Sequence, residues 1–181
     1  MNLVLNSKSK LLISIIVIVL VLGLTLWEHF NGGVSSHHFF HNKNMPKISN
    51  WWGLLSIPIL TWLSLSIIQK RKNKNHEEKT VSRFEIYGFW GGFLFGVALT
   101  ILFYNESGFS NYLLLLTFVF ALFIPIYKPE YYLGFILSML YGFGGVLPAV
   151  IGLLLIAIYA IEYHVIRKAF LFIINKTRPL S

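Results

Sequence analysis

Histidine and glutamate side chains are concentrated in one short stretch of this sequence. Four of the six histidines follow a single glutamate within residues 28–41. Imidazole and carboxylate groups together suit zinc, copper, iron or nickel, and a bound divalent ion polarises a substrate or activates water. We therefore expect a metal or catalytic site, with a divalent metal such as zinc as its cofactor. Its ligands would come from Glu28, His29, His37, His38 and His41.

The spacing of the histidines favours one pair of ligands. His37 and His41 are four residues apart, so they share a face if Ser35 or Ser36 caps a short helix here. His38 and His41 are the alternative pair. In the other interpretation, these histidines lie at a membrane interface and hydrogen-bond headgroups or water, and no metal binds.

The other ionisable residues give weaker indications of a functional site. Glu106 lies in the polar stretch 105–111, where it would share a face of the membrane with the histidines, but Asn and Gly also suit a plain turn. Glu162 and His164, near the end of the last apolar stretch, are expected to face the aqueous boundary. No charged residue or histidine falls in the middle of a predicted span, which argues against an ion or proton pathway.

The composition predicts the kind of structure that must position these residues. Hydrophobic residues make up 56% of the 181 residues and charged residues only 12%. A soluble domain has about 25% charged residues. The mean hydropathy of +0.68 points the same way. We therefore expect an all-α integral membrane protein with a single polytopic membrane domain, residues 1–181.

Apolar runs long enough to cross a bilayer recur along the chain, since a spanning helix needs about 20 such residues. The first run also fits a signal peptide, but small residues at a cleavage site are absent, so we interpret it as an uncleaved helix. The first four predicted spans are Leu11–Trp27, Trp51–Ile68, Ile86–Tyr104 and Tyr112–Tyr127, and Ser49 or Asn50 caps the second.

The stretch Tyr131–Tyr163 is too long for one straight span. Three glycines and a proline within 142–148 predict a break there. The two resulting spans are 131–144 and 147–163. The alternative is one tilted, kinked helix, which would give five spans in all.

The distribution of basic residues favours six spans. With six spans and a cytoplasmic N-terminus, 13 of the 15 Lys and Arg residues lie inside, and only Lys43 and Lys47 lie outside. We therefore expect a compact bundle of about six transmembrane helices, with both termini cytoplasmic, in the plasma membrane. The formal net charge of +8 indicates membrane lipids as partners and no nucleic acid, because the basic residues flank apolar spans.

Gly88, Gly92 and Gly96 form a ridge of small residues on the third predicted helix. Small residues at this spacing let two helices approach closely. The ridge therefore predicts a tight helix contact, either within the chain or with a second copy or another membrane protein.

Three functions fit these features. The first is a non-catalytic membrane partner or assembly factor, which the glycine ridge and the modest size favour slightly. The second is a membrane enzyme whose His and Glu residues act on a lipid or another amphipath at the extracytoplasmic face. The third is a small-molecule transporter.

Overall fold

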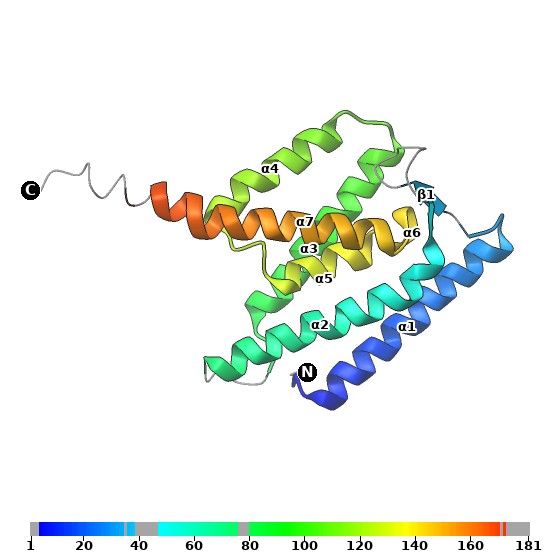
Figure 1. Ribbon diagram of the computed structural model, residues 1–181, viewed down its shortest axis with the longest axis horizontal. Helices are drawn as coiled ribbons and strands as arrows, with labels where there is room; N and C mark the ends of the chain where they lie inside the picture. The colour runs from blue at the N-terminus through cyan, green and yellow to red at the C-terminus, as the bar shows by residue number, and fades with distance from the viewer. Residues whose placement is uncertain (1–3, 35, 39–46, 76–79, 171, 173–181) are drawn as a thin grey trace, which may run out of the picture.

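The computed structural model describes residues 4–34, 36–38, 47–75, 80–170 and 172. This part of the chain is α-helical apart from one ribbon of two short strands (Figure 1). Four of its helices are long and apolar enough to cross a membrane. Three of these helices correspond to the predicted spans 11–27, 51–68 and 86–104, and the fourth begins at Val146. The class expected from the composition, a helical membrane protein, is therefore supported.

Helix α1, Ser7–Phe30, begins and ends where its flanking residues dictate. The Asn6 side chain accepts a hydrogen bond from the Ser9 amide at 2.8 Å, and the Ser9 hydroxyl accepts one from the Asn6 amide at 2.9 Å. This reciprocal cap satisfies two amides that the helix cannot satisfy itself. At the other end Gly32 and Gly33 have φ of 118° and 96°, a conformation that favours glycine and ends the helix.

The residues after α1 form a strand where a short helix was predicted. Strand β1, Ser36–His38, pairs antiparallel with β2, Lys47–Ser49, so that His37 lies opposite Ile48. Over Ser36–His38 the helix prediction was therefore wrong, and the helical spacing of His37 no longer argues for a shared face. The prediction used neighbouring residues alone and treated Ser36 as a helix cap. The strand that pairs with Ser36–His38 begins nine residues later, at Lys47, so the local pattern could not indicate it.

A short 3-10 turn, Asn50–Trp52, leads from β2 into helix α2, Gly53–Lys74. The Ser49 hydroxyl accepts a hydrogen bond from the Trp51 amide at 3.4 Å and so caps this turn. Helix α2 itself begins after Trp52 without a side-chain cap, so the predicted cap at Ser49 lies on the turn before the helix. The helix continues past Ile68 into its basic residues.

Helices α3, Arg83–Tyr104, and α4, Phe109–Phe123, follow. Ser82 and Glu85 cap α3 reciprocally. Helix α4 ends four residues before the predicted limit at Tyr127, because the residue before a proline disfavours helical dihedral angles. Ile124, which precedes Pro125, is accordingly extended, with φ of −113° and ψ of 132°.

The long apolar stretch breaks and reverses, as predicted. It forms α5, Pro129–Ser138, then α6, Leu140–Phe143, and then α7, Val146–Ile161. The hydroxyl of Tyr132 donates a hydrogen bond to the carbonyl oxygen of Ala149 at 3.1 Å. Residues on the two sides of the turn therefore face each other, which a single kinked helix could not achieve. A π-helical segment, Glu162–Ile166, continues α7.

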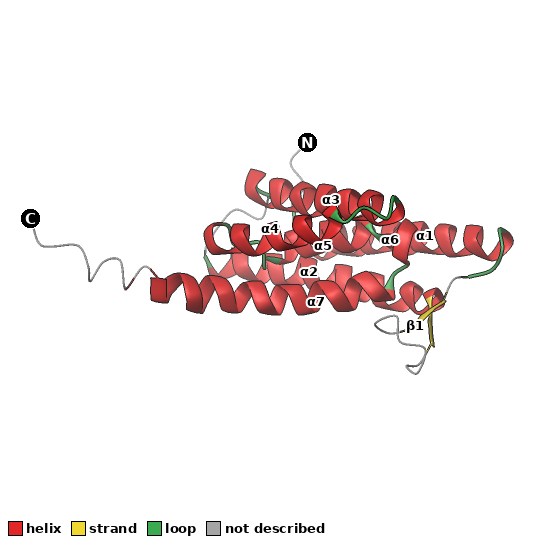
Figure 2. Cartoon of the chain, turned by 90° about the horizontal axis from the view of Figure 1, so that it is seen from above, coloured by secondary structure: helices red, strands yellow, loops and turns green. Residues whose placement is uncertain are grey.

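Helix α5 is the central element of the bundle. Figure 2 shows it between α3 and α7, and it also contacts α2. Its Tyr132, Leu133, Phe135 and Ile136 side chains are all buried. On the two outer sides, α1 packs along α2, and α4 packs against α3 and α7 (Figure 1).

The glycine ridge of α3 faces α5. A Cβ atom on Gly92 would overlap the carbonyl oxygen of Tyr131, and one on Gly96 would overlap the hydroxyl of Ser138. Gly134 of α5 meets α3 in the same way, at the carbonyl oxygen of Phe89. The predicted tight helix contact therefore exists within the chain. A contact of Gly88, Gly92 and Gly96 with a partner stays a prediction.

Candidate functional site

An open cavity of about 710 Å³ lies at the end of the bundle where α1 and α3 finish, which we call the Glu28 end. Side chains and backbone from α1, the 3-10 turn, α3 and α6 form its walls. Its lining residues are Trp27, Glu28, Asn31, Gly33, Asn50, Thr100, Ile101, Tyr104, Asn105, Tyr141 and Gly142. We call this space the Glu28 cavity.

A chain of contacts positions the carboxylate of Glu28. The side-chain amide of Asn50 donates a hydrogen bond to the Glu28 Oε2 atom at 3.4 Å, and Asn50 is itself buried. Gly144, with φ of 69°, lies directly against the Asn50 side chain, where a Cβ atom would overlap it. The turn between α6 and α7 therefore holds Asn50, and Asn50 holds Glu28.

Aromatic rings and amides surround this carboxylate. The rings of Trp27 and Tyr141 lie 5.9 Å apart between centroids. The Tyr104 hydroxyl donates a hydrogen bond to the Gly142 carbonyl oxygen at 3.0 Å. Among the described residues that line the cavity, Glu28 is the only charged one, and none is Lys, Arg or His.

Of the predicted metal ligands, the structure describes the side chains of Glu28 and His29. The ring of His29 packs against the rings of Phe30 and Trp51, at 5.4 and 6.1 Å between centroids. The described residues contain no group of three or more His, Cys, Asp and Glu that could hold a metal ion. The side chains of His37 and His38, and all of His41, lie outside the described part of the chain. The zinc site therefore stays a prediction.

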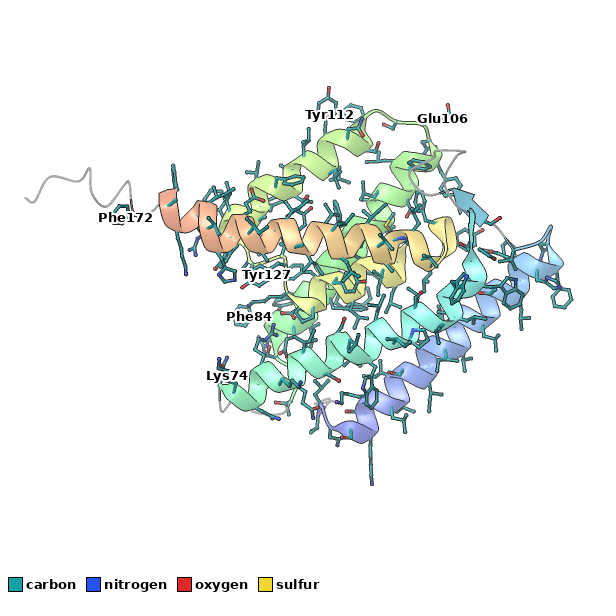
Figure 3. The ribbon with its side chains drawn as sticks, in the orientation of Figure 1. Lys74, Phe84, Glu106, Tyr112, Tyr127 and Phe172 are labelled. Atoms are coloured by element: carbon teal, nitrogen blue, oxygen red, sulfur yellow. The ribbon has the colours of Figure 1, made fainter. Side chains whose placement is uncertain are left out.

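A cluster of four charged side chains, which the sequence analysis did not predict, lies at the opposite end of the bundle. Arg71 of α2 forms two hydrogen bonds with the carboxylate of Glu130 of α5, both at 3.1 Å, and a third with Glu85 of α3 at 3.1 Å. The ammonium group of Lys72 lies 3.1 Å from the other carboxylate oxygen of Glu85. We call these four residues the Arg71 cluster, and their end of the bundle the Arg71 end (Figure 3 labels Lys74 and Phe84 nearby).

Burial and charge balance indicate what the Arg71 cluster does. The side chains of Lys72, Glu85 and Glu130 are only 3–5% exposed, and that of Arg71 is 27% exposed. Two positive charges meet two negative charges, so each buried charge has its counter-charge. Such a closed network ties helices together rather than offering a free group to a ligand. In the sequence, Glu85 stands at the third position after Ser82, as a helix-capping residue does, and Glu130 follows Pro129 at a helix start. Neither pattern indicates that these glutamates pair with Arg71 or Lys72.

An apolar groove runs between α4 and the helices α3, α5 and α7. Two cavities of about 290 and 300 Å³ share Phe135 and Leu155 in their walls, and together they form this α4 groove. The hydroxyls of Thr117 on α4 and Tyr159 on α7 are hydrogen-bonded to each other across it. That hydrogen bond is the polar contact that closes α4 against α7.

Glu162 lies one helical turn beyond Tyr159, and its position corrects the sequence-based expectation. The residue is 91% buried, whereas an aqueous boundary position was expected. It begins the π-helical segment, which packs against α4.

Comparison with family models, with curated proteins and with solved structures gives no match for this chain. The functional argument therefore rests on the geometry of these sites.

Proposed function

We propose that this protein crosses the plasma membrane six times, with both termini in the cytoplasm. The distribution of the basic residues and the reversal of the chain between α6 and α7 support this arrangement. In it, the Arg71 cluster lies at the cytoplasmic side and the Glu28 cavity opens on the extracytoplasmic side.

We further propose that the protein is a non-catalytic membrane partner whose Glu28 cavity binds the positively charged headgroup of an amphipath. One observation carries the proposal. The cavity holds a carboxylate, which Asn50 positions beside the aromatic side chains of Trp27, Tyr104 and Tyr141.

The chemistry of these groups selects a cation. A carboxylate attracts an ammonium group, and the faces of Trp and Tyr rings add about 0.5–2 kcal/mol for such a cation, depending on how far it is desolvated. The side-chain amides of Asn31 and Asn105 donate hydrogen bonds to the carbonyl oxygens of Trp27 and Ile101. Their amide oxygens are the atoms that would accept hydrogen bonds from the polar parts of the same headgroup. At the membrane surface, the tail of an amphipath stays in lipid while its headgroup enters the cavity.

The two alternative functions, a metal-dependent enzyme and a transporter, each require a further structural feature. A metal-dependent enzyme needs His37, His38 and His41 to converge on Glu28, and these side chains lie outside the described part of the chain. A transporter needs a pathway between the two membrane faces. The Glu28 cavity and the α4 groove have no lining residue in common, so neither supports such a pathway.

The proposal is tested by calorimetric titration of the purified protein in an uncharged maltoside detergent. The probe is decyltrimethylammonium, with decyl sulfate as the matched anion and empty micelles as the blank. We expect saturable binding of the cation alone. Glu28→Gln should raise its Kd about tenfold, which corresponds to about 1.4 kcal/mol.

Glu106→Gln is the matched control, because Glu106 is exposed at the same end of the bundle but does not line the cavity (Figure 3). This variant should bind the cation like the wild type. Equal binding of cation and anion by the wild type, or an unchanged Kd for Glu28→Gln, would overturn the proposal.

A further inference from the structure

The α4 groove is an apolar space that the proposed function does not use. Helices α3, α5 and α7 form its inner walls, and Phe135 and Leu155 face both of its cavities. On its outer side it is lined by Leu116 and Phe120 of α4, which are each 46% exposed. The groove therefore reaches the outer surface of the bundle, which faces lipid when the protein is in a membrane.

The hydroxyl groups of Thr117, Tyr132 and Tyr159 in the walls of the groove are hydrogen-bonded within the protein. Thr117 and Tyr159 bond each other, and Tyr132 donates to the carbonyl oxygen of Ala149 at 3.1 Å. A polar ligand would lose its hydrogen bonds with water on entering such a space, whereas a hydrocarbon chain gains from burial there. The groove therefore fits the acyl chain of a lipid.

Aromatic rings and cationic side chains lie where the groove reaches the Arg71 end. Ile126 lines the groove, and the next residue, Tyr127, lies beside the last turns of α7 (Figure 3). The ring of Tyr127 packs against those of Tyr163 and His164, at 5.5 and 5.0 Å between centroids. The guanidinium group of Arg167 lies 4.7 Å from the centre of the Tyr163 ring. We call the following residues the groove mouth: Tyr127, Lys128, Tyr163, His164 and Arg167.

The two cations of the groove mouth have no counter-charge of their own. Arg167 and Lys128 are half-buried, and their side chains form no hydrogen bond or ion pair with other described residues. The described glutamates of this end are enclosed, since Glu85 and Glu130 belong to the Arg71 cluster and Glu162 is buried. The described surface of the groove mouth therefore presents positive charge.

We propose that the α4 groove binds an anionic phospholipid, with one acyl chain in the groove and the phosphate group on Arg167 and Lys128. A guanidinium group presents a fork of donors that matches phosphate, and basic pockets between membrane helices bind anionic headgroups. Tyrosine side chains such as those of the groove mouth are typical of the headgroup level. A zwitterionic lipid fits less well, because its ammonium group would bring a positive charge to a positive surface.

Native mass spectrometry of the delipidated full-length protein in maltoside detergent tests the headgroup. The probes are dioleoyl phosphatidylglycerol and dioleoyl phosphatidylcholine, which share their acyl chains and differ in headgroup charge. We expect the wild type to bind phosphatidylglycerol at least about fivefold more tightly, the factor that one basic residue near an anionic headgroup contributes. Arg167→Gln should weaken phosphatidylglycerol binding by about the same factor. Lys74→Gln removes an exposed charge at the same end and should leave binding unchanged. Equal binding of the two lipids by the wild type, or equal binding of phosphatidylglycerol by Arg167→Gln and Lys74→Gln, would overturn the proposal.

A second pair of variants tests the groove itself. Leu155→Trp places a larger side chain in both cavities and should weaken the binding of phosphatidylglycerol. Leu154→Trp is the matched control, because Leu154 is 50% exposed and does not line the groove. Equal binding by these two variants, with both folded as judged by thermal unfolding, would overturn the placement of the acyl chain. If Leu155→Trp does not fold, the comparison of Arg167→Gln with Lys74→Gln still decides.

The two binding proposals can fail separately. Glu28→Gln should bind phosphatidylglycerol like the wild type, because Glu28 lies at the opposite end of the bundle. Leu155→Trp also closes the groove to decyl sulfate, so repeating the titration of the Glu28 cavity on this variant keeps the two sites apart.

Discussion

At the scale of single residues, the Arg71 cluster is the strongest polar feature of the described structure. Arg71 is the residue that connects α2 to both α3 and α5, because its guanidinium group bonds Glu85 and Glu130 at once. Lys72 balances the second charge of Glu85. Removing one partner from a buried pair leaves an unpaired charge, which costs more than the pair itself contributes.

Glu130→Gln should therefore lower the free energy of unfolding by about 3–5 kcal/mol, the range for breaking a buried ion pair. The double variant Arg71→Met with Glu130→Gln should be more stable than Glu130→Gln alone, because Lys72 and Glu85 still neutralise each other. Thermal and denaturant unfolding in detergent would measure both effects.

Lys70→Met is the control for this series, since Lys70 is exposed and belongs to none of the cluster's ion pairs. It should change stability by less than about 0.5 kcal/mol. A Glu130→Gln variant as stable as Lys70→Met would show that the cluster is not a structural tie.

At the scale of elements, the contact between α3 and α5 decides how closely the bundle packs. Glycines on both helices bring the two backbones together, and no side chain on the ridge could fit the space. Helix α5 is thereby fixed between α3 and α7, and the turn that holds Asn50 depends on its position.

Gly92→Leu should destabilise the protein by at least about 1–3 kcal/mol, the usual cost of overpacking, because its side chain would overlap the backbone of Tyr131. Gly23→Leu is the matched control. A Cβ atom on Gly23 meets nothing within 4 Å, so this leucine only adds to the surface of α1.

Thermal unfolding and size-exclusion chromatography of the two variants would check this prediction. If Gly92→Leu unfolds at the same temperature as Gly23→Leu and keeps the wild-type oligomeric state, then α3 and α5 do not pack as closely as described.

The elements also show what sequence could and could not predict. The helices were predictable because apolar runs, caps and the glycine-rich break at 142–148 act over a few neighbouring residues. The three-residue strand β1 was not, because its partner β2 determines it. Glu28 was predicted as a metal ligand together with the histidines, and that role stays a prediction. The pairing of Arg71 with Glu130, 59 residues away, depends on tertiary packing that no local pattern encodes.

At the scale of the whole molecule, the charges are divided between the two ends. Arg71, Lys72 and Lys74 close α2 at one end. The described lining of the Glu28 cavity at the other end has no basic residue. Positive charge near the ends of spans keeps those ends in the cytoplasm. The proposed orientation follows from this asymmetry.

Reporter fusions test the orientation. An export-dependent phosphatase inserted at Gly108 should be active, because the connection between α3 and α4 lies at the Glu28 end. Gly108 is chosen as the insertion point because nothing lies within 4 Å of its side-chain position. The same enzyme fused after Ser181 should be inactive. Activity at Ser181 would exclude six spans with both termini inside.

The short length of α4 has a consequence for the lipid around the protein. Its 15 residues span only about 22 Å along the helix axis, against a hydrocarbon core of about 30 Å. In the proposed topology the bilayer must become thinner beside α4, and the cost grows with each ångström of mismatch. Lipids with short or unsaturated tails should therefore collect on this side of the molecule. Thick, sterol-rich membranes should exclude the protein.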